Sequence, residues 1–262
     1  MIKPKPCSLQ DYPRWLEEKG LKTFNGIEET YYCTVVGSLQ SQFMAHVFWT
    51  TVIGKLKDWA EQYKIDTKYD LYSKEPTSGI LTKPWDSVVE KTYRKNVLEN
   101  PSESDLPCET CLTPENYLLK LKDILRTTFV VKYLDGVDFL ATRLTDQARE
   151  LGLRTEIDRQ AKDVGYYALH YTVWLPFSVP RRDWNAETLP IAVEIQITTQ
   201  LQEVIKKLLH RHYEATRIDP DKGAIDWRWD YRSKEFFANY LGHILHYMEG
   251  AILEVRDKEK GN

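Results

Sequence analysis

Residues 169–199 read LHYTVWLPFSVPRRDWNAETLPIAVEIQITT, and this stretch decides the fold class. Its two ends, LHYTVWLPF and IAVEIQITT, are rich in β-branched and aromatic residues and are bounded by Pro or Asn, which is typical of strands. In the second run, the two-residue period of a strand puts Glu194, Gln196 and Thr198 on one face and apolar side chains on the other. We expect the apolar face to join the core, and the polar face to meet solvent or to form the floor of a site.

Strand and helix patterns continue on both sides of this stretch. Helical periodicity marks the segments before the strand-rich middle, within it and after it. The sequence therefore predicts one α/β (α+β) domain over residues 1–262, with N-terminal helices within 8–63 and a C-terminal helix over 232–256. The expected strands cover residues 127–133, 153–160, 169–177 and 191–199, and the expected helices cover 40–63, 85–98, 137–152, 200–217 and 233–256.

The expected C-terminal helix carries a broad apolar stripe. We expect this stripe to dock on the chain's own core, with a partner helix as the alternative. His243 and His246 are expected to be packing or surface residues rather than a metal pair. The stripe consists of Phe236, Phe237, Tyr240, Leu241, Ile244, Leu245, Met248 and Ile252.

The composition limits the classes of protein that the chain can represent. Of its 262 residues, 42% are hydrophobic and 29% are charged, and no apolar run approaches the roughly 20 residues that cross a bilayer. The N-terminal residues MIKPKPCSLQDYPRW contain no apolar signal segment, so we expect a cytoplasmic protein without a membrane partner. The net charge of −3 does not indicate nucleic-acid binding by the molecule as a whole.

The four cysteines include one C-x-x-C pair, Cys108 and Cys111. No second C-x-x-C or histidine pair follows at the spacing of a zinc finger. We therefore expect plain reduced thiols here, rather than a metal or redox site.

Two acidic residues and several basic ones suggest a common ligand. Asp123 precedes the first expected strand, where a carboxylate can point across a sheet edge, and Glu194 lies on the last. Two carboxylates brought together repel each other unless a cation lies between them, and Mg²⁺ suits such an oxygen pair. Taken singly, each is an ordinary surface acid, and the basic residues are an ordinary solvated helix face. Together they suit nucleoside polyphosphates. The basic residues are Lys83, Lys91, Arg94 and Lys95, on or before one short helix, and Lys162 before Gly165.

Five motifs in a fixed order carry a resemblance to a known family. They are T-K-P-W-D-S-V-V-E-K from Thr82, Asp123, K-x-x-G-Y-x-x-L-H from Lys162, E-I-Q-I-x-T from Glu194 and H-x-x-Y-E from His210. Each motif alone would be a weak signal. In this order, over about residues 80–217, the chain resembles the synthetase domain of the RelA/SpoT family.

The resemblance implies a nucleotidyltransferase-like mixed sheet flanked by helices, with a catalytic core over about residues 78–217. It also implies an ATP-dependent pyrophosphokinase, which moves the β,γ-pyrophosphate of ATP to a ribose 3′-hydroxyl and leaves AMP. Asp123 and Glu194 would hold Mg²⁺, Glu194 would accept the proton of the attacking hydroxyl, and Tyr166 would stack on the acceptor base. The residues implied to bind phosphate are Lys83, Lys91, Arg94 and Lys162, and those implied to support the site are His170 and His210.

The chain departs from the family pattern where phosphate-binding arginines usually stand. Leu81, Tyr167 and Thr198 occupy positions at which the family usually has Arg, and lysine does not reproduce a bidentate arginine contact. Arg126 stands two places earlier than the usual arginine after Asp123. These departures fit a different acceptor, or a site completed by Arg126, Arg154 or Arg159.

Three functions follow from the resemblance. The chain has no His-Asp dipeptide, so we expect synthesis without hydrolysis, as in the small single-domain synthetases that make the guanosine alarmones ppGpp and pppGpp from ATP and a guanosine nucleotide. The alternative is a toxin that pyrophosphorylates the 3′ end of tRNA, blocks translation and is neutralised by an antitoxin protein. A third hypothesis is a catalytically inactive nucleotide-binding module. The tRNA-binding candidates are Lys206, Lys207, Arg211 and Arg217.

Overall fold

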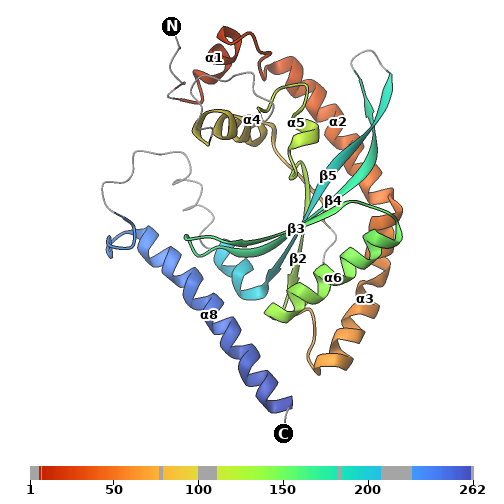
Figure 1. Cartoon of the computed structure of the whole chain (residues 1–262), viewed down its shortest axis with the longest axis vertical. Coiled ribbons are helices and arrows are strands. Elements are labelled where there is room, and N and C mark those ends of the chain that lie inside the picture. Colours follow the sequence, from red (N-terminus) through yellow and green to blue (C-terminus); the bar gives the residue numbers. More distant parts are fainter. Residues whose placement is uncertain are drawn as a thin grey trace. The chain divides into compact units, whose positions relative to one another are not determined.

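The structure is a computed structural model that describes residues 6, 8–76, 79–99, 111–181, 185–207 and 226–260. The chain divides into two compact units, and each is described by itself. Figure 1 labels the helices and strands of both. The first unit comprises residues 1–49, 80–126 and 173–194, and the second comprises residues 50–79, 127–172 and 195–262.

The described strands form one mixed five-stranded sheet in the order β1-β2-β5-β4-β3. All four expected strands are present, which confirms the predicted fold class. The strand that the sequence did not reveal is β1, which is too short to show a period and pairs antiparallel with β2. The strands are β1 (Leu81–Thr82), β2 (Leu125–Val131), β3 (Thr155–Ala161), β4 (Tyr167–Pro180) and β5 (Ala186–Thr199).

Strand β5 is buried on both faces over its second half. Residues 191–199 are all buried, and Glu194, Gln196 and Thr198 are each less than 9% exposed. The expectation that this polar face meets solvent was therefore wrong. Because buried polar groups need partners, a strand with three polar side chains under cover is a place where a site is expected.

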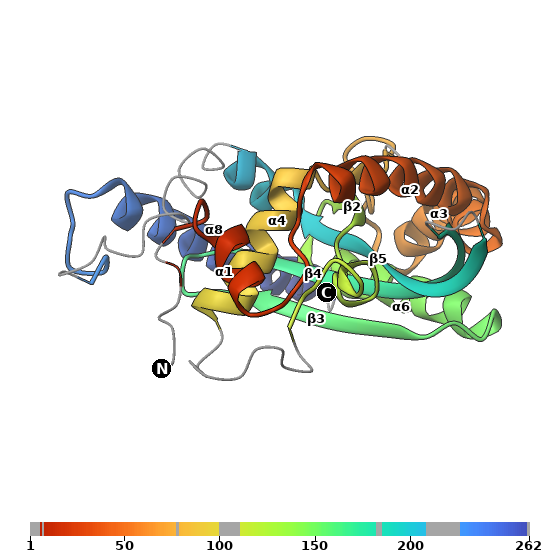
Figure 2. The ribbon, with the colours of Figure 1, turned by 90° about the horizontal axis from the view of Figure 1, so that it is seen from above.

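In the first unit, short helices pack on one another through aromatic and amide side chains. Tyr12 meets Tyr93 edge to face at 5.4 Å, and its hydroxyl accepts a hydrogen bond from Asn96 Nδ2 at 2.8 Å. Figure 2 shows α1 beside α4. The expected helix over 85–98 is confirmed, with a π-helical last turn closed by Glu99 N–H to Arg94 O at 2.8 Å. The elements are α1 (Tyr12–Glu18), α2 (Gly26–Ala45), α4 (Trp85–Tyr93), η1 (Arg94–Leu98) and α5 (Tyr117–Lys120).

Helix α2 lies along the outer half of β4, as Figure 1 shows. It begins at a good cap, because the side chain of Asn25 accepts hydrogen bonds from the N–H groups of Ile27 and Glu28. Further along, the amide of Gln42 both donates to Ser178 O and accepts from Ser178 N–H, each at 2.8 Å. The amide thus satisfies the backbone of a strand edge, as a neighbouring strand would.

The helical run expected over 40–63 is interrupted at His46. Helix α2 ends at Ala45, and α3 (Val47–Thr67) starts one residue later. The His46 backbone is extended, and its Nδ1 accepts a hydrogen bond from Phe48 N–H at 3.1 Å. The His46 ring therefore caps the start of α3. Apolar periodicity could not reveal this break between α2 and α3.

The second unit holds most of α3, helix α6 (Leu134–Glu150), helical residues 200–207 and α8 (Lys234–Lys260). Helix α6 ends before Gly152, whose φ of +65° is the left-handed conformation that glycine adopts readily. The C-terminal helix is present, two residues later than expected at its start and four at its end.

Helix α8 does not dock through its apolar stripe, so that prediction was wrong. Phe237, Ile244 and Met248 are about half or more exposed. The buried face of α8 consists instead of small and polar residues that contact other parts of the second unit. They are Ala238, Asn239, Gly242, Glu249 and Arg256.

The structure also bears on the state of the cysteines. Cys111 is disulfide-bonded, so the expectation of reduced thiols was wrong for this residue, whereas Cys33 is free.

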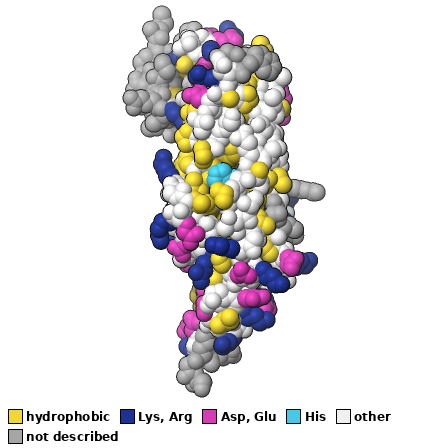
Figure 3. Space-filling model, turned by 90° about the vertical axis from the view of Figure 1, so that its right-hand side faces the viewer, with side chains coloured by type: hydrophobic (Ala, Val, Ile, Leu, Met, Phe, Trp, Pro, Cys, Tyr) yellow, Lys and Arg dark blue, Asp and Glu magenta, His cyan; other side chains and the backbone are white. Residues whose placement is uncertain are grey.

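Within the described part of the chain, none of the helices combines the length and apolarity that a bilayer span requires. On the face in Figure 3, basic and acidic side chains are intermixed rather than separated by sign.

Candidate active site

Asp123 lies between two lysines in the first unit. Its Oδ2 is 3.0 Å from Lys83 Nζ, and its Oδ1 is 2.8 Å from Lys91 Nζ. Three elements position these groups: Asp123 comes two residues before β2, Lys83 directly follows β1, and Lys91 lies on α4. The antiparallel pairing of β1 with β2 brings Lys83 beside Asp123, and its N–H donates to Ile124 O at 2.9 Å. Sequence reasoning named all three residues but assigned the lysines to phosphate, and did not pair them with Asp123.

The cluster is mostly hidden from water, which makes its charges interact strongly. Asp123, Lys83 and Lys91 are between 13% and 19% exposed at the side chain. Burial raises the pKa of the Asp123 carboxyl, but Lys91 and Lys83 outweigh it and bring the pKa to about 2. Burial lowers the pKa of the Lys91 ammonium, and the Asp123 carboxylate opposes that shift. The side-chain nitrogens of Lys83 and Lys91 therefore share one buried carboxylate.

Glu194 belongs to the same electrostatic neighbourhood. It lies on β5, which is the neighbour of β2 in the sheet, and it is 8% exposed. Its carboxylate raises the pKa of Lys91, as that of Asp123 does. The two predicted carboxylates thus act on one lysine of the same unit, although they are 71 positions apart in the sequence.

The donor set fits a magnesium ion that shares its ligands with a substrate. Mg²⁺ usually takes one or two protein carboxylates and completes its shell with waters and phosphates. Asp123 and Glu194 supply two, and Asp123 Oδ1 accepts no hydrogen bond of good geometry despite its ion pair with Lys91. Among the residues that the structure describes, no group of three or more His, Cys, Asp or Glu is arranged to hold a metal. A cage made by protein alone is not present there.

The other predicted cations of the first unit point elsewhere. Arg94 Nε lies 2.9 Å from Glu99 Oε1, and Lys95 Nζ lies 3.4 Å from Glu99 Oε2. The expected cationic face of this helix is thus divided, with Lys91 turned to Asp123 and Arg94 turned to Glu99. Arg126 is half-buried on β2, opposite Leu81 of β1.

In the second unit, residues 162–166 form a tight turn after β3. Lys162 N–H donates to Tyr166 O at 3.0 Å, and Gly165 N–H donates to Lys162 O at 2.8 Å. Gly165 has φ of +72°, so the turn requires the left-handed conformation that glycine permits. A residue with a Cβ would be strained at this position of the K-x-x-G-Y motif.

Three side chains of this motif interact at the turn. The Lys162 ammonium is exposed and lies 5.7 Å from the centre of the Tyr166 ring. The Tyr166 hydroxyl is 3.0 Å from His170 Nε2, which fixes the orientation of the ring. Tyr166 is half-buried rather than sealed in the core. A partly exposed ring next to an exposed lysine suits a ligand that has both an aromatic base and a phosphate.

The residues predicted for tRNA binding are only partly within the described chain. Lys206 Nζ donates to Gln196 Oε1 at 3.1 Å, and Lys207 Nζ lies 3.3 Å from Glu203 Oε1. Both lysines thus have partners in their own unit. The remaining candidates, Arg211 and Arg217, lie outside the described residues, as does His210.

Sequence reasoning missed the partners of Tyr167. Its ring stacks on His246 at 3.7 Å between centres and 10° between planes, and its hydroxyl is 2.7 Å from His243 Nδ1. The two histidines stand three apart on one helix, and that spacing was the available signal.

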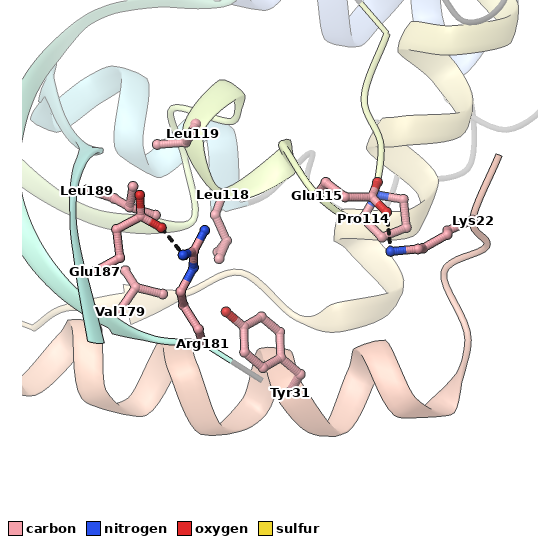
Figure 4. A pocket seen from close by; sticks show the side chains of 10 residues that line it. All are labelled: Lys22, Tyr31, Pro114, Glu115, Leu118, Leu119, Val179, Arg181, Glu187 and Leu189. Carbon is pink, nitrogen blue, oxygen red and sulfur yellow. Dashed lines mark ion pairs between the residues drawn. The ribbon is translucent and has the colours of Figure 1, made fainter. Parts of the chain in front are cut away.

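A separate pocket of about 430 Å³ lies in the first unit (Figure 4). Arg181 faces Glu187 at 3.0 Å and Lys22 faces Glu115 at 2.9 Å, so both cations that line it are neutralised by acids. Tyr31 reaches it from α2. The pocket contains none of the predicted site residues, and we do not assign the reaction to it.

The fold can be compared with known proteins. No protein-family model matches the sequence, and no curated protein matches it. The structure is similar to the small alarmone synthetase 1 from Bacillus subtilis, which is 15% identical, with 97% of this chain and 100% of that chain covered and a TM-score of 0.52. A GTP pyrophosphokinase family protein from Streptococcus pneumoniae is 19% identical over 96% and 95% of the two chains, with a TM-score of 0.47. The first likeness shows that the chain has the fold of a small alarmone synthetase, as the sequence motifs predicted.

Proposed function

We propose that the chain is an ATP-dependent pyrophosphokinase that transfers the β,γ-pyrophosphate of ATP to the 3′-hydroxyl of a guanosine nucleotide. The observation that carries this proposal is the buried group of Asp123, Lys83 and Lys91, with Glu194 acting on the same lysine. This group combines two carboxylates with two lysines on a synthetase fold. Such a set suits the transfer of a charged phosphoryl group better than nucleotide binding without catalysis.

The residues have distinct tasks in the proposed reaction. Bound Mg²⁺ would neutralise the charge that develops on the phosphate oxygens. Lys83 and Lys91 are held in place by Asp123 before substrate arrives, so they need little reorganisation to contact a polyphosphate. Glu194 accepts the proton of the 3′-hydroxyl, and its buried position on a central strand keeps the carboxylate oriented. Tyr166 stacks on the acceptor base, and Lys162 contacts its phosphates.

The first experiment tests whether Glu194 is a catalytic group. Glu194→Gln keeps the size of the side chain and one acceptor oxygen, but its amide cannot accept the proton. We expect kcat to fall by at least about a hundredfold, while the affinity for a non-hydrolysable ATP analogue stays within about threefold. Glu187→Gln on the same strand, which breaks only the exposed pair with Arg181, is the matched control and should keep full activity. An unchanged rate for Glu194→Gln would refute the assignment.

The second experiment identifies the acceptor. The protein is incubated with γ-³²P-ATP and, separately, with GDP, GTP, ATP or deacylated tRNA. We expect label on the guanosine nucleotides, because pyrophosphate transfer carries the γ-phosphate with it. Label on tRNA alone would reject alarmone synthesis, and no label on any acceptor would leave the chain a nucleotide-binding module.

One observation favours the tRNA alternative. Tyr167 stands where related synthetases usually have a phosphate-binding Arg, and its ring and hydroxyl are both engaged by histidines of α8. An acceptor that needs fewer phosphate contacts at this position, such as a polynucleotide 3′ end, would tolerate this exchange. A neutralising antitoxin would then be an additional partner. The same labelling experiment separates the two acceptors.

A further inference from the structure

The turn that carries Lys162 and Tyr166 rests directly on helix α8. Gly165 and Gly242 approach so closely that a Cβ added at Gly242 would lie 2.2 Å from Gly165 O, and one added at Gly165 would lie 2.3 Å from Asn239 O. Both positions therefore require glycine, since no side-chain movement can relieve a collision with backbone.

His243 joins the two sides of the same turn. Its Nε2 is 2.8 Å from Asp163 O, and its Nδ1 is 2.7 Å from the Tyr167 hydroxyl. A carbonyl oxygen can only accept, so Nε2 must carry a hydrogen and donate it. In the neutral ring, Nδ1 then accepts from the hydroxyl. One imidazole thus ties Asp163, before the glycine, to Tyr167, after Tyr166.

Two more contacts add to this attachment. The His246 ring stacks on the Tyr167 ring, and Arg228 Nη2 lies 3.2 Å from Asp163 Oδ2. The His246 imidazole is in turn 3.6 Å from the buried carboxylate of Glu249. Asp163, Gly165 and Tyr167 thus each contact α8, and Asp163 also contacts Arg228 in the segment before that helix. A turn fixed at both ends gives its central ring one orientation.

We propose that Gly242 and His243 of α8 are positioning residues, which hold the turn 162–167 so that Tyr166 and Lys162 present the geometry that binds the acceptor nucleotide. This inference rests on the proposed function. As a positioning residue, His243 acts through the Asp163 carbonyl and the Tyr167 hydroxyl, both of which it contacts. The C-terminal helix then supports the acceptor site by holding the turn that forms it.

The kinetic test separates positioning from general destabilisation. In His243→Ala, the KM for the acceptor should rise about five- to tenfold, as expected for the loss of two hydrogen bonds that orient the turn, with kcat and the KM for ATP within about twofold. His243→Gln restores a donor at the position of Nε2 and should recover most of the affinity. Tyr247→Ala, on the exposed side of the same helix, is the matched control and should leave all constants unchanged.

Hydrogen exchange gives a readout that does not depend on catalysis. Amides of residues 162–170 should exchange faster in His243→Ala than in the wild type, and at the wild-type rate in His243→Gln and Tyr247→Ala. Gly242→Ala, which pushes the turn off the helix, should show the same local increase. An unchanged acceptor KM in an active His243→Ala enzyme, or equal loss of all constants without rescue by Gln, would overturn the proposal. If the wild type transfers no label to any acceptor, the proposed function fails, while unchanged exchange in His243→Ala would independently refute the role of His243.

Discussion

At the scale of single residues, Asp123 shows how a buried acid is kept ionised. Burial acts against the carboxylate, and two lysines that reach it from a strand end and from a helix reverse the effect. Burial also acts on Lys91, because it disfavours the charged ammonium and lowers the pKa of that group. The arrangement keeps two lysine side chains beside a carboxylate that could also bind a metal ion.

The first prediction concerns stability against pH. The pKa of Asp123 is lowered to about 2 from an ordinary value of 3.8, so its ion pairs stabilise the fold fully above about pH 4 and lose this effect as the pH falls toward 2. Asp123→Asn should reduce the free energy of unfolding by about 2 kcal/mol at pH 7, and the difference from the wild type should shrink by about half at pH 3.

Urea unfolding followed at pH 7, 5, 4 and 3 measures this difference. Asp70→Asn is a suitable control, because the Asp70 pair with Lys64 is exposed to solvent and should contribute little at any pH. A gap between Asp123→Asn and wild type that grows toward low pH would contradict the assignment of the lowered pKa.

The second prediction concerns Tyr166. Tyr166→Ala should raise the KM for the acceptor about tenfold or more, because a base stacked on an aromatic ring gains roughly 1 to 3 kcal/mol. Tyr166→Phe keeps the ring and loses only the hydroxyl contact with His170, so its KM should stay within about threefold of the wild type. Tyr231→Ala, at an exposed tyrosine outside the motif, serves as control. Equal effects of Ala and Phe would mean that the hydroxyl, not stacking, matters.

At the scale of elements, α8 buries its small and polar residues and exposes much of its apolar stripe. Near its C-terminal end, Arg256 makes two hydrogen bonds of 3.1 Å to the carboxylate of Asp135 on α6. Its guanidinium also lies 4.1 Å and 4.4 Å from the ring centres of Tyr69 and Tyr133. The helix is thus fixed at this end by a bidentate ion pair between aromatic rings, and nearer its start by the glycine contact.

The third prediction tests this anchor. Arg256→Met should lower the free energy of unfolding by about 2 kcal/mol, somewhat less than is usual for a broken buried pair, because the Asp135 side chain is 35% exposed. Lys258→Ala breaks an exposed pair with Glu254 on the same helix and should cost less than about 0.5 kcal/mol. Thermal and urea unfolding measure both. Equal, small losses would show that Arg256 is not an anchor.

At the scale of the whole molecule, the net charge is −3, and several of the described basic residues, among them Arg94, Arg181 and Lys207, have acidic partners close to them. Attraction of a polyanion from a distance is therefore weak, and the candidate site relies on a few enclosed cations. A small nucleotide can reach such a cluster, whereas a long polyanion gains most from an open basic surface.

The fourth prediction uses this difference. With a guanosine nucleotide as acceptor, kcat/KM should fall less than about tenfold between 50 and 200 mM salt, since few exposed cations release counterions. Steady-state rates at constant Mg²⁺ measure the dependence, with the KM for ATP determined at each salt concentration as control. A fall of about a hundredfold or more with deacylated tRNA as the better acceptor would favour the polynucleotide alternative.

The sequence by itself determined four of the five strands and the order of the motifs, because period, turn chemistry and spacing are local properties of the chain. It also placed a glycine between the lysine and the ring of the K-x-x-G-Y motif, and glycine permits tight turns. Only the tertiary structure decided that Asp123 pairs with Lys83 and Lys91, that Tyr167 of β4 contacts two histidines of α8, and that much of the apolar stripe of α8 is exposed. These outcomes depend on which distant side chains meet in a packed interior, and the free energy of such contacts depends on burial and charge, which no local pattern records.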